Sequence, residues 1–209
     1  HSKMKNLILE NPLEKIYSLG TNAFHCSLCP RMLGKRKVLG LQNGNPTSRI
    51  LFIAEAPGRH GAELSGIPLQ GDKSGENFEK LIKNIGWARS QIFVTNSVLC
   101  NPVNERGNNS RPLIQEMKNC SSFLEETLNI VSPEFVVTLG TIALKSLNFV
   151  QSHKFVLLED VGKILAWNGM KLVPLYHPSP RVTAATRSFK QMQQDFKILA
   201  RNVGNPIRI

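Results

Sequence analysis

The feature that most restricts the fold of this chain is the alternation of short apolar segments with helical ones. The apolar segments, which have the length of strands, occupy residues 49–54, 91–99, 134–140 and 171–177. Helices are expected at residues 74–85, 112–129, 141–147 and 184–202. Strands that alternate with helices pair in parallel and are covered on both faces. We therefore expect an α/β fold, a three-layer α/β/α sandwich with a short, mainly parallel central sheet.

The remaining segments add detail to this expectation. A further helix is expected at residues 7–19, and Ser74 has a side chain suited to cap the helix that follows it. Residues 149–169 follow no clear period and are compatible with a short hairpin. No linker or repeat divides the 209 residues, so a single domain is expected over residues 3–209. Residues 1–2 resemble the remnant of an expression tag.

The chain carries a strong excess of positive charge. Lys and Arg outnumber Asp and Glu by 26 to 15, which gives a formal net charge of +11. Such an excess suits a polyanionic partner, and the phosphate backbone of a nucleic acid is the leading choice. A basic surface that serves only solubility is the alternative.

Nothing in the sequence resembles a membrane segment or an export signal. No apolar run reaches the ~20 residues that a membrane span requires, and the N-terminus lacks a signal-peptide pattern. The composition, 41% hydrophobic and 20% charged, is typical of a soluble globular protein. We expect a cytoplasmic monomer with no membrane attachment.

The chain contains four cysteines, Cys26, Cys29, Cys100 and Cys120. Structural disulfides are not expected in a chain without an export signal. The C-x-x-C pair brings two thiolates within reach of one metal, and Cys100 and Cys120 lie beside polar loop segments. The spacing therefore indicates a four-thiolate metal site, with zinc and iron–sulfur both open. The alternative is that Cys100 and Cys120 are buried apolar residues unrelated to the pair.

Polar residues stand at the ends of three of the expected strands. Glu55 follows the first strand, Asn96 is expected at the end of the second, and His177 stands at the end of the last. A parallel sheet carries its working groups at the carboxyl ends of its strands, so these three side chains are expected to meet around a small polar ligand. The loop from Glu55 to Gly75 contains repeated glycines, which let its backbone approach such a ligand closely.

Four blocks of the sequence, taken in order, resemble the signature of a known family. They read "AEAPGRHGAELSGIPLQGDKSG", "TNSVLCNP", "VVTLG" and "YHPSPR". Together with the four cysteines, they resemble the iron–sulfur uracil-DNA glycosylases of family 4, with some features of family 5, over residues 26–201. The resemblance implies base excision repair: hydrolysis of the N-glycosidic bond of uracil, in single- or double-stranded DNA, to leave an abasic site. It also implies a [4Fe-4S] cluster on Cys26, Cys29, Cys100 and Cys120, where spacing alone leaves zinc open.

The resemblance assigns roles to the residues at the strand ends. His177 is the implied donor to uracil O2, where negative charge builds as the base departs. Asn96 is the implied base reader, because its amide matches uracil O4 and N3–H whereas cytosine presents the reverse pattern. Glu55 is implied to act on water or on the cationic sugar, with Glu63 and Asp72 as alternatives. The structural alternatives are a histidine that caps a strand end and an asparagine in a turn.

Further residues are expected to enclose the base or to contact DNA. The residues expected around the base are Ala56, Pro57, Gly58, Leu69 and Asn96. The residues expected to contact DNA are Gly71, Asp72, Lys73, Ser74, Arg181 and Arg187. The first four open a helix, whose N-terminus suits a phosphate. Arg181, or its neighbour Val182, is expected to enter the minor groove, and Arg187 is expected to bind a phosphate.

One departure from the family concerns the base itself. The family carries an aromatic residue where "GIPLQG" has Leu69, and stacking of a base on an aromatic ring is worth on the order of ~1–3 kcal/mol. Leucine supplies an apolar wall without that stacking. A glycosylase for a deaminated purine, hypoxanthine or xanthine, is therefore one alternative, and a non-catalytic iron–sulfur module that binds DNA is another.

Overall fold

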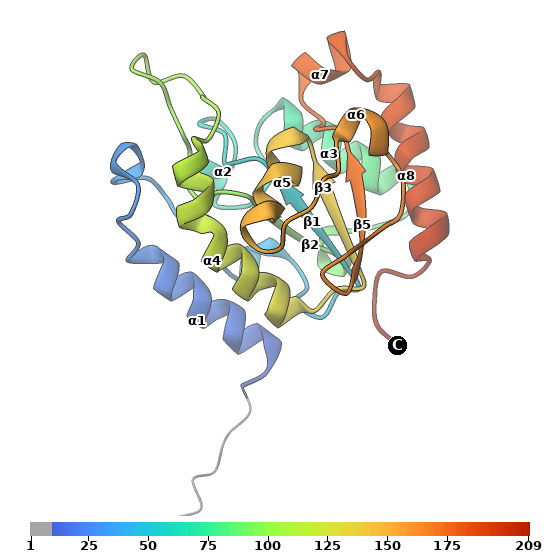
Figure 1. The fold of residues 1–209 in the computed structure, drawn as a ribbon, viewed down its shortest axis with the longest axis horizontal. Helices are drawn as coiled ribbons and strands as arrows, with labels where there is room; N and C mark the ends of the chain where they lie inside the picture. Colours follow the sequence, from blue (N-terminus) through green and yellow to red (C-terminus); the bar gives the residue numbers. More distant parts are fainter. Residues whose placement is uncertain (1–9) are drawn as a thin grey trace, which may run out of the picture.

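The computed structural model describes residues 10–209, which are built around a five-stranded sheet (Figure 1). The strands are β1 (Ile50–Ala54), β2 (Phe93–Asn96), β3 (Phe135–Leu139), β4 (Leu165–Trp167) and β5 (Met170–Leu175). Their order in the sheet is β2-β1-β3-β5-β4. All neighbours are parallel except β4, which pairs with β5 in the antiparallel sense. The expected mainly parallel sheet is confirmed.

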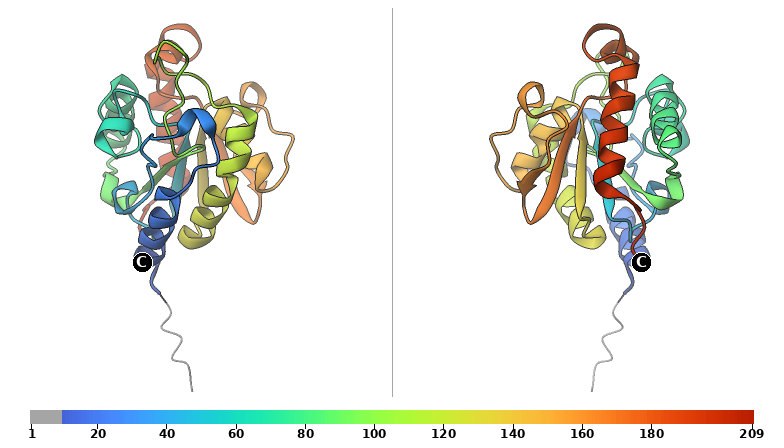
Figure 2. Two further views of the ribbon diagram at one scale, coloured as in Figure 1. Left: turned by 90° about the vertical axis from the view of Figure 1, so that its left-hand side faces the viewer. Right: turned by 90° about the vertical axis from the view of Figure 1, so that its right-hand side faces the viewer.

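Helices cover both faces of this sheet (Figure 2). The α-helices are α1 (Pro12–Phe24), α2 (Ala62–Ser65), α3 (Lys73–Asn84), α4 (Ile114–Val131), α5 (Thr141–Ser146), α6 (Leu157–Asp160), α7 (Pro180–Ala185) and α8 (Phe189–Val203). The 3-10 helices are η1 (Pro30–Met32), η2 (Leu41–Asn43), η3 (Arg89–Gln91) and η4 (Leu147–Phe149). Side chains of α3 and α8 pack on one face, and those of α4 and α5 pack on the other. The three-layer arrangement is therefore confirmed.

The central strands are buried on both faces, which explains why they read as uninterrupted apolar runs. Every residue of β1 and of β3 is buried. At the centre, the Phe52 ring stacks on that of Phe196 with centroids 6.0 Å apart, and it meets the edge of Phe78 at 5.3 Å. These aromatic contacts fix α3 and α8 against β1.

The N-terminal helix begins later than residues 7–19 would place it. Asn11 caps α1, its side chain accepting a hydrogen bond from the Glu14 N–H while the Glu14 carboxylate accepts one from the Asn11 N–H. This reciprocal pair sets the start of the helix, which then runs to Phe24. Residues 1–9, which include the start of the expected helix and the expected tag remnant, lie outside the described residues.

The C-terminal part differs from the single helix expected over residues 184–202. Two helices, α7 and α8, stand there, because Ser188 begins a second capping box with Gln191. Residues 149–169 do not contain a complete hairpin, because only β4 lies there and it pairs with β5, the strand expected at residues 171–177. The turn between these two strands places Asn168 and Gly169 at positive φ, 48° and 73°, as a tight Asn-Gly hairpin turn requires. Among the described residues, no helix is long and apolar enough to cross a membrane.

Candidate active site

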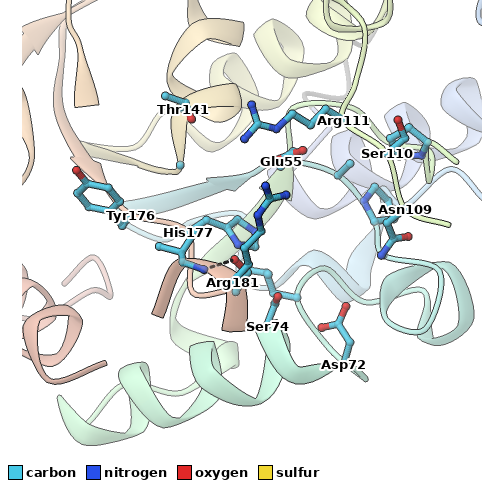
Figure 3. A pocket seen from close by; sticks show the side chains of 18 of the residues that line it. Glu55, Asp72, Ser74, Asn109, Ser110, Arg111, Thr141, Tyr176, His177 and Arg181 are labelled. Atoms are coloured by element: carbon cyan, nitrogen blue, oxygen red, sulfur yellow. Dashed lines mark hydrogen bonds between the residues drawn. The ribbon is translucent and has the colours of Figure 1, made fainter. Parts of the chain in front are cut away.

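A cavity of about 640 Å³ lies at the carboxyl edge of the sheet (Figure 3). Glu55 enters it from the end of β1, Thr141 from the end of β3 and His177 from the end of β5. The strand order reverses between β1 and β3, which is where open α/β sheets bind their ligands. The volume is within the range of roughly 300–1,000 Å³ that small-molecule sites occupy. The cavity is therefore the candidate active site.

Glu55 is a partly buried carboxylate in the wall of this cavity. Burial raises its pKa above the ordinary value for glutamate, while the positive charge of Arg111 acts in the opposite direction. The Arg111 guanidinium lies across from the carboxylate in Figure 3. Of the alternatives for its role, Glu63 does not line the cavity, because one of its carboxylate oxygens accepts a hydrogen bond from the Arg36 N–H at 3.3 Å.

His177 is held in the cavity by a close approach of two backbones. Gly140 has φ +94°, and a Cβ at that position would lie 3.1 Å from the Cβ of His177, so glycine lets the end of β5 pack against the end of β3. The carbonyl of Pro178 accepts a hydrogen bond from the Asn77 side chain at 2.8 Å, which ties the histidine loop to α3. Burial lowers the pKa of His177 to about 4, against the opposing charge of Asp72. The imidazole is neutral at pH 7.

Asp72, not Ser74, caps the N-terminus of α3, so the expectation for Ser74 is wrong. One Asp72 oxygen accepts the N–H of Gly75 at 2.9 Å, and the other lies 2.6 Å from where a Cβ on Gly58 would stand. Glycine at position 58 leaves room for this carboxylate. A negative group already occupies the helix N-terminus, which makes that end less favourable for a phosphate; the expected contact of residues 71–74 with DNA stays a prediction. Lys73 pairs with Glu76 on the exposed side of the helix.

Leu69 lines the cavity in a backbone conformation that is uncommon for its residue type. Its φ is 51°, in the left-handed region, and its side chain is buried. The Arg89 guanidinium holds this turn, because it donates to the carbonyl of Pro68 at 2.6 Å and also to that of Leu69. The leucine therefore forms a fixed apolar wall in the place where the sequence led us to expect one.

Asn96 is close to the cavity but does not line it. It is the last residue of β2, is 2% exposed and pairs in register with Ala54. Its Nδ2 has no hydrogen-bond partner within the described residues, which is rare for a buried amide. The structure thus brings Glu55, His177 and Leu69 to one cavity, and leaves the amide of Asn96 buried beside it.

The loop after β2 supplies cavity residues that sequence reasoning missed. Asn101 is fully buried, and its Nδ2 donates to the carbonyl of Pro57 at 2.7 Å and to Oδ1 of Asn109 at 2.9 Å, while its own Oδ1 has no partner. Arg111, on the same loop, also lines the cavity. The polar run "NPVNERGNNSR" signals a loop after a strand, but no pattern within it distinguishes the residues that turn inward.

The other expected contacts divide into two groups. Ala56, Pro57 and Gly58 all line the cavity, and Arg181 and Val182 stand at its rim on α7. Arg187 does not reach the cavity, since it forms two hydrogen bonds to the Asp195 carboxylate, at 3.0 and 2.6 Å. The guanidinium of Arg187 thus already has an acidic partner, which argues against the expected phosphate contact without testing it.

The four cysteines gather around a second, much smaller cavity. They are all free thiols, and they come from the loops after α1 and β2 and from α4. Burial raises the pKa of Cys100 to about 11 and that of Cys120 to about 12, and the neighbouring cysteines act in the same direction. Within residues 10–209, no group of three or more His, Cys, Asp or Glu side chains is placed to hold a single metal ion.

These features define a class of protein. The molecule is an open α/β sheet protein whose cavity, at the point where the strand order reverses, presents a carboxylate, a neutral imidazole and a guanidinium. Residues 41–200 match the family model described as the uracil DNA glycosylase superfamily, and the chain belongs to that superfamily. The resemblance inferred from the sequence blocks is confirmed.

Curated relatives agree with this assignment. A Type-4 uracil-DNA glycosylase of Thermotoga maritima is 32% identical over 74% of this chain and 76% of its own length. A Type-4 uracil-DNA glycosylase of Sulfurisphaera tokodaii is 32% identical over 74% of this chain and 70% of its own length. A Type-5 uracil-DNA glycosylase of Pyrobaculum aerophilum is 26% identical over 75% of this chain and 79% of its own length.

Proposed function

We propose that this protein hydrolyses the N-glycosidic bond of uracil in DNA and leaves an abasic site. One observation carries the proposal: the carboxylate of Glu55 and the neutral imidazole of His177 share one cavity at the switch point of the sheet. The superfamily membership and the names of the Type-4 relatives support the same reaction. In that reaction the oxygen of one water bonds to the sugar C1′, and the base leaves with the electrons of the broken C1′–N1 bond.

His177 is proposed to stabilise the departing base. The base carries negative charge as the bond breaks, and a preorganised donor aimed at that charge is often the largest single catalytic contribution. Because burial lowers the pKa of His177 to about 4, the ring is neutral at pH 7 and keeps one N–H to donate. It can donate a hydrogen bond to uracil O2 without losing its proton.

Glu55 is proposed to face the water and the sugar. As a carboxylate it can accept a hydrogen bond from the attacking water, and its charge opposes the positive charge that develops on the sugar. Asp72 is the alternative within the cavity, but it caps α3 through one oxygen. The carboxylate oxygens of Glu55 are therefore more available to a reacting molecule than those of Asp72.

Asn96 and the neighbouring loop are proposed to read the base. An unpaired Nδ2 in a buried amide is satisfied when uracil O4 accepts its hydrogen bond, and uracil N3–H can donate to its Oδ1. Asn96 does not line the cavity as it stands, so this role requires that its amide become accessible when a base enters. Ala56, Pro57 and Gly58 then surround the base with backbone groups.

DNA is proposed to lie across the rim formed by α7. Arg181 and Val182 stand there, where a cation and an apolar wedge can fill the space that a flipped nucleotide leaves. The net charge of +11 supports attraction to the phosphate backbone. We further propose that the protein acts as a cytoplasmic monomer on single- or double-stranded DNA.

The cysteines are proposed to hold a [4Fe-4S] cluster. Four free thiols around one cavity fit such a group, and a cluster separates its ligands more widely than a single zinc ion with Zn–S bonds of about 2.3 Å does. Bound there, the cluster would connect the loops after α1 and β2 to α4. Purified protein is expected to contain iron and acid-labile sulfide, roughly four of each per chain, and Cys120→Ser should lose both. Stoichiometric zinc without iron would contradict the cluster.

One observation favours a second substrate. Leu69 stands where the resemblance implies an aromatic residue, so this wall of the cavity offers no ring to stack on uracil, although Tyr176 also lines the cavity. Hypoxanthine or xanthine is therefore a candidate substrate. The test uses labelled oligonucleotides that each carry one uracil, hypoxanthine or xanthine, followed by alkaline cleavage of abasic sites. We expect cleavage at uracil. Cleavage only at a deaminated purine would change the substrate, and binding of all three without cleavage would indicate a non-catalytic DNA-binding module.

A further inference from the structure

We propose that Arg111 is a positioning residue that keeps the Glu55 carboxylate in its charged form inside the cavity. The sequence blocks that indicate the family do not include this arginine, which lies on the loop between β2 and α4. The consequence for catalysis rests on the proposed function, in which Glu55 acts as a carboxylate. The charge on Glu55 can nevertheless be measured without DNA.

The two side chains face each other across the cavity. Both line it, and Figure 3 shows the guanidinium on the side of the Glu55 carboxylate. Within residues 10–209, neither Glu55 nor Arg111 belongs to any ion pair. The guanidinium is thus not neutralised by another carboxylate, and the space between the two groups stays open to a water or a substrate.

Hydrogen bonds hold the main chain at Arg111, which fixes where this exposed residue stands in the cavity wall. Arg31 donates to the Arg111 carbonyl at 2.7 Å and to the Ser110 hydroxyl at 3.3 Å. The same arginine pairs with Glu116 on α4 at 2.7 Å, where the Glu116 side chain is only 5% exposed. Pro112, which follows Arg111, is buried and further restricts the chain.

The other charged or titratable groups around the cavity do not replace Arg111. Asp72, at the N-terminus of α3, adds negative charge, and His177 after β5 is neutral at pH 7. Arg181 lies on α7 at the rim, and Tyr176 precedes His177. Burial raises the pKa of Glu55, and Arg111 is the cation that lowers it. Without Arg111, the balance therefore shifts toward the protonated acid.

A titration of the DNA-free protein tests the proposal directly. The glutamate side-chain carboxyls are labelled with ¹³C, and the Glu55 signal is assigned by its absence in Glu55→Gln. In Arg111→Gln we expect the midpoint of Glu55 to rise by about one pH unit, and in Arg111→Lys to stay near that of the wild type. Arg106→Gln, which removes an exposed cation from the same loop, should leave the midpoint unchanged. An unchanged midpoint in Arg111→Gln overturns the proposal.

The pH dependence of excision distinguishes this role from simple DNA binding. In Arg111→Gln the acid limb of kcat/KM should move upward with the Glu55 midpoint, so that activity falls about tenfold below both midpoints and little at pH 8. A rise in KM at every pH, without a shift of the acid limb of the kcat/KM profile, would indicate that Arg111 contacts a phosphate. That result would contradict the proposal. Equal thermal unfolding midpoints show that the variant is folded. If the wild type excises no base, the proposed function fails, and the titration still decides the role of Arg111.

Discussion

His177 shows how strongly single neighbours set the state of a residue. Burial lowers the pKa of its ring to about 4, and Gly140 lets the end of β3 approach the end of β5, where the histidine stands. The sequence indicated a functional histidine after the last strand, since a polar residue at the carboxyl end of a strand is a recognisable pattern. Its depressed pKa depends on tertiary burial, which no local pattern reports.

The lowered pKa of His177 makes stability depend on pH. The unfolded histidine takes up a proton near pH 6.5 and the folded one only near pH 4. The unfolded state therefore binds more protons between these values, and stability is lost as the pH falls from 6.5 to 4, by up to about 3 kcal/mol. We expect His177→Gln to lose less stability over this window in urea unfolding. Parallel curves for the two proteins would contradict the burial of the ring.

Leu69 offers a test of base recognition at a single side chain. Leu69→Phe restores an aromatic surface in the cavity wall, and we expect uracil excision to show a lower KM, by at least about fivefold, because stacking is worth roughly 1–3 kcal/mol. Leu69→Met, similar in volume but not aromatic, serves as the matched control. A phenylalanine variant with the same KM as the methionine variant would show that stacking at this position does not matter.

At the scale of elements, the site depends on loops that are tied down by arginines. Strands and helices were predictable because β1 and β3 are buried runs and because helical segments follow them. The start of α3 was not predictable, since Ser74 and Asp72 both have side chains that cap helices well. The choice between them depends on the room that Gly58 leaves for the Asp72 carboxylate. The capping box at Ser188 does indicate the break between α7 and α8. The apolar residues keep a helical period across residues 184–202, which favoured a single helix instead.

Arg31 is expected to hold the loop that carries Arg111. Arg31→Ala should cost roughly 3 kcal/mol of stability, because it leaves the carboxylate of Glu116 buried and unpaired. It should also speed hydrogen exchange at the backbone amides of residues 110, 111 and 113, since Pro112 has no N–H. Arg31→Lys retains the charge beside Glu116 but not the fork of donors, so stability should largely recover while exchange stays fast. Slow exchange in both variants would show that the loop is held by other contacts.

Arg181 and Arg187 lie close in sequence but are expected to behave differently. Arg181→Ala should weaken DNA binding and reduce the slope of log affinity against log salt by about one, as the loss of one phosphate contact does. Arg187→Ala should leave that slope unchanged and lower stability by roughly 2–3 kcal/mol, because Arg187 pairs with Asp195. Equal slopes for Arg181→Ala and the wild type would remove α7 from the DNA interface.

At the scale of the whole molecule, the strand order β2-β1-β3-β5-β4 creates the site. The reversal of this order between β1 and β3 opens the crevice in which Glu55 and His177 meet. The two residues are 122 positions apart in the sequence, from 55 to 177. The convergence of strand-end residues was predictable from the parallel sheet. The contribution of Asn101 and Arg111 was not, because a long loop folds back through side-chain hydrogen bonds that leave no periodic trace.

The central claim is that a neutral His177 in this cavity drives the departure of a flipped uracil. Single-turnover excision of uracil from a duplex, measured beside duplex affinity for the wild type and His177→Ala, tests it most directly. We predict that the substitution lowers the excision rate at least a hundredfold, as the loss of a preorganised donor does, with affinity changed less than about threefold. An excision rate within a few-fold of the wild type, or an equal loss of affinity, would contradict the account.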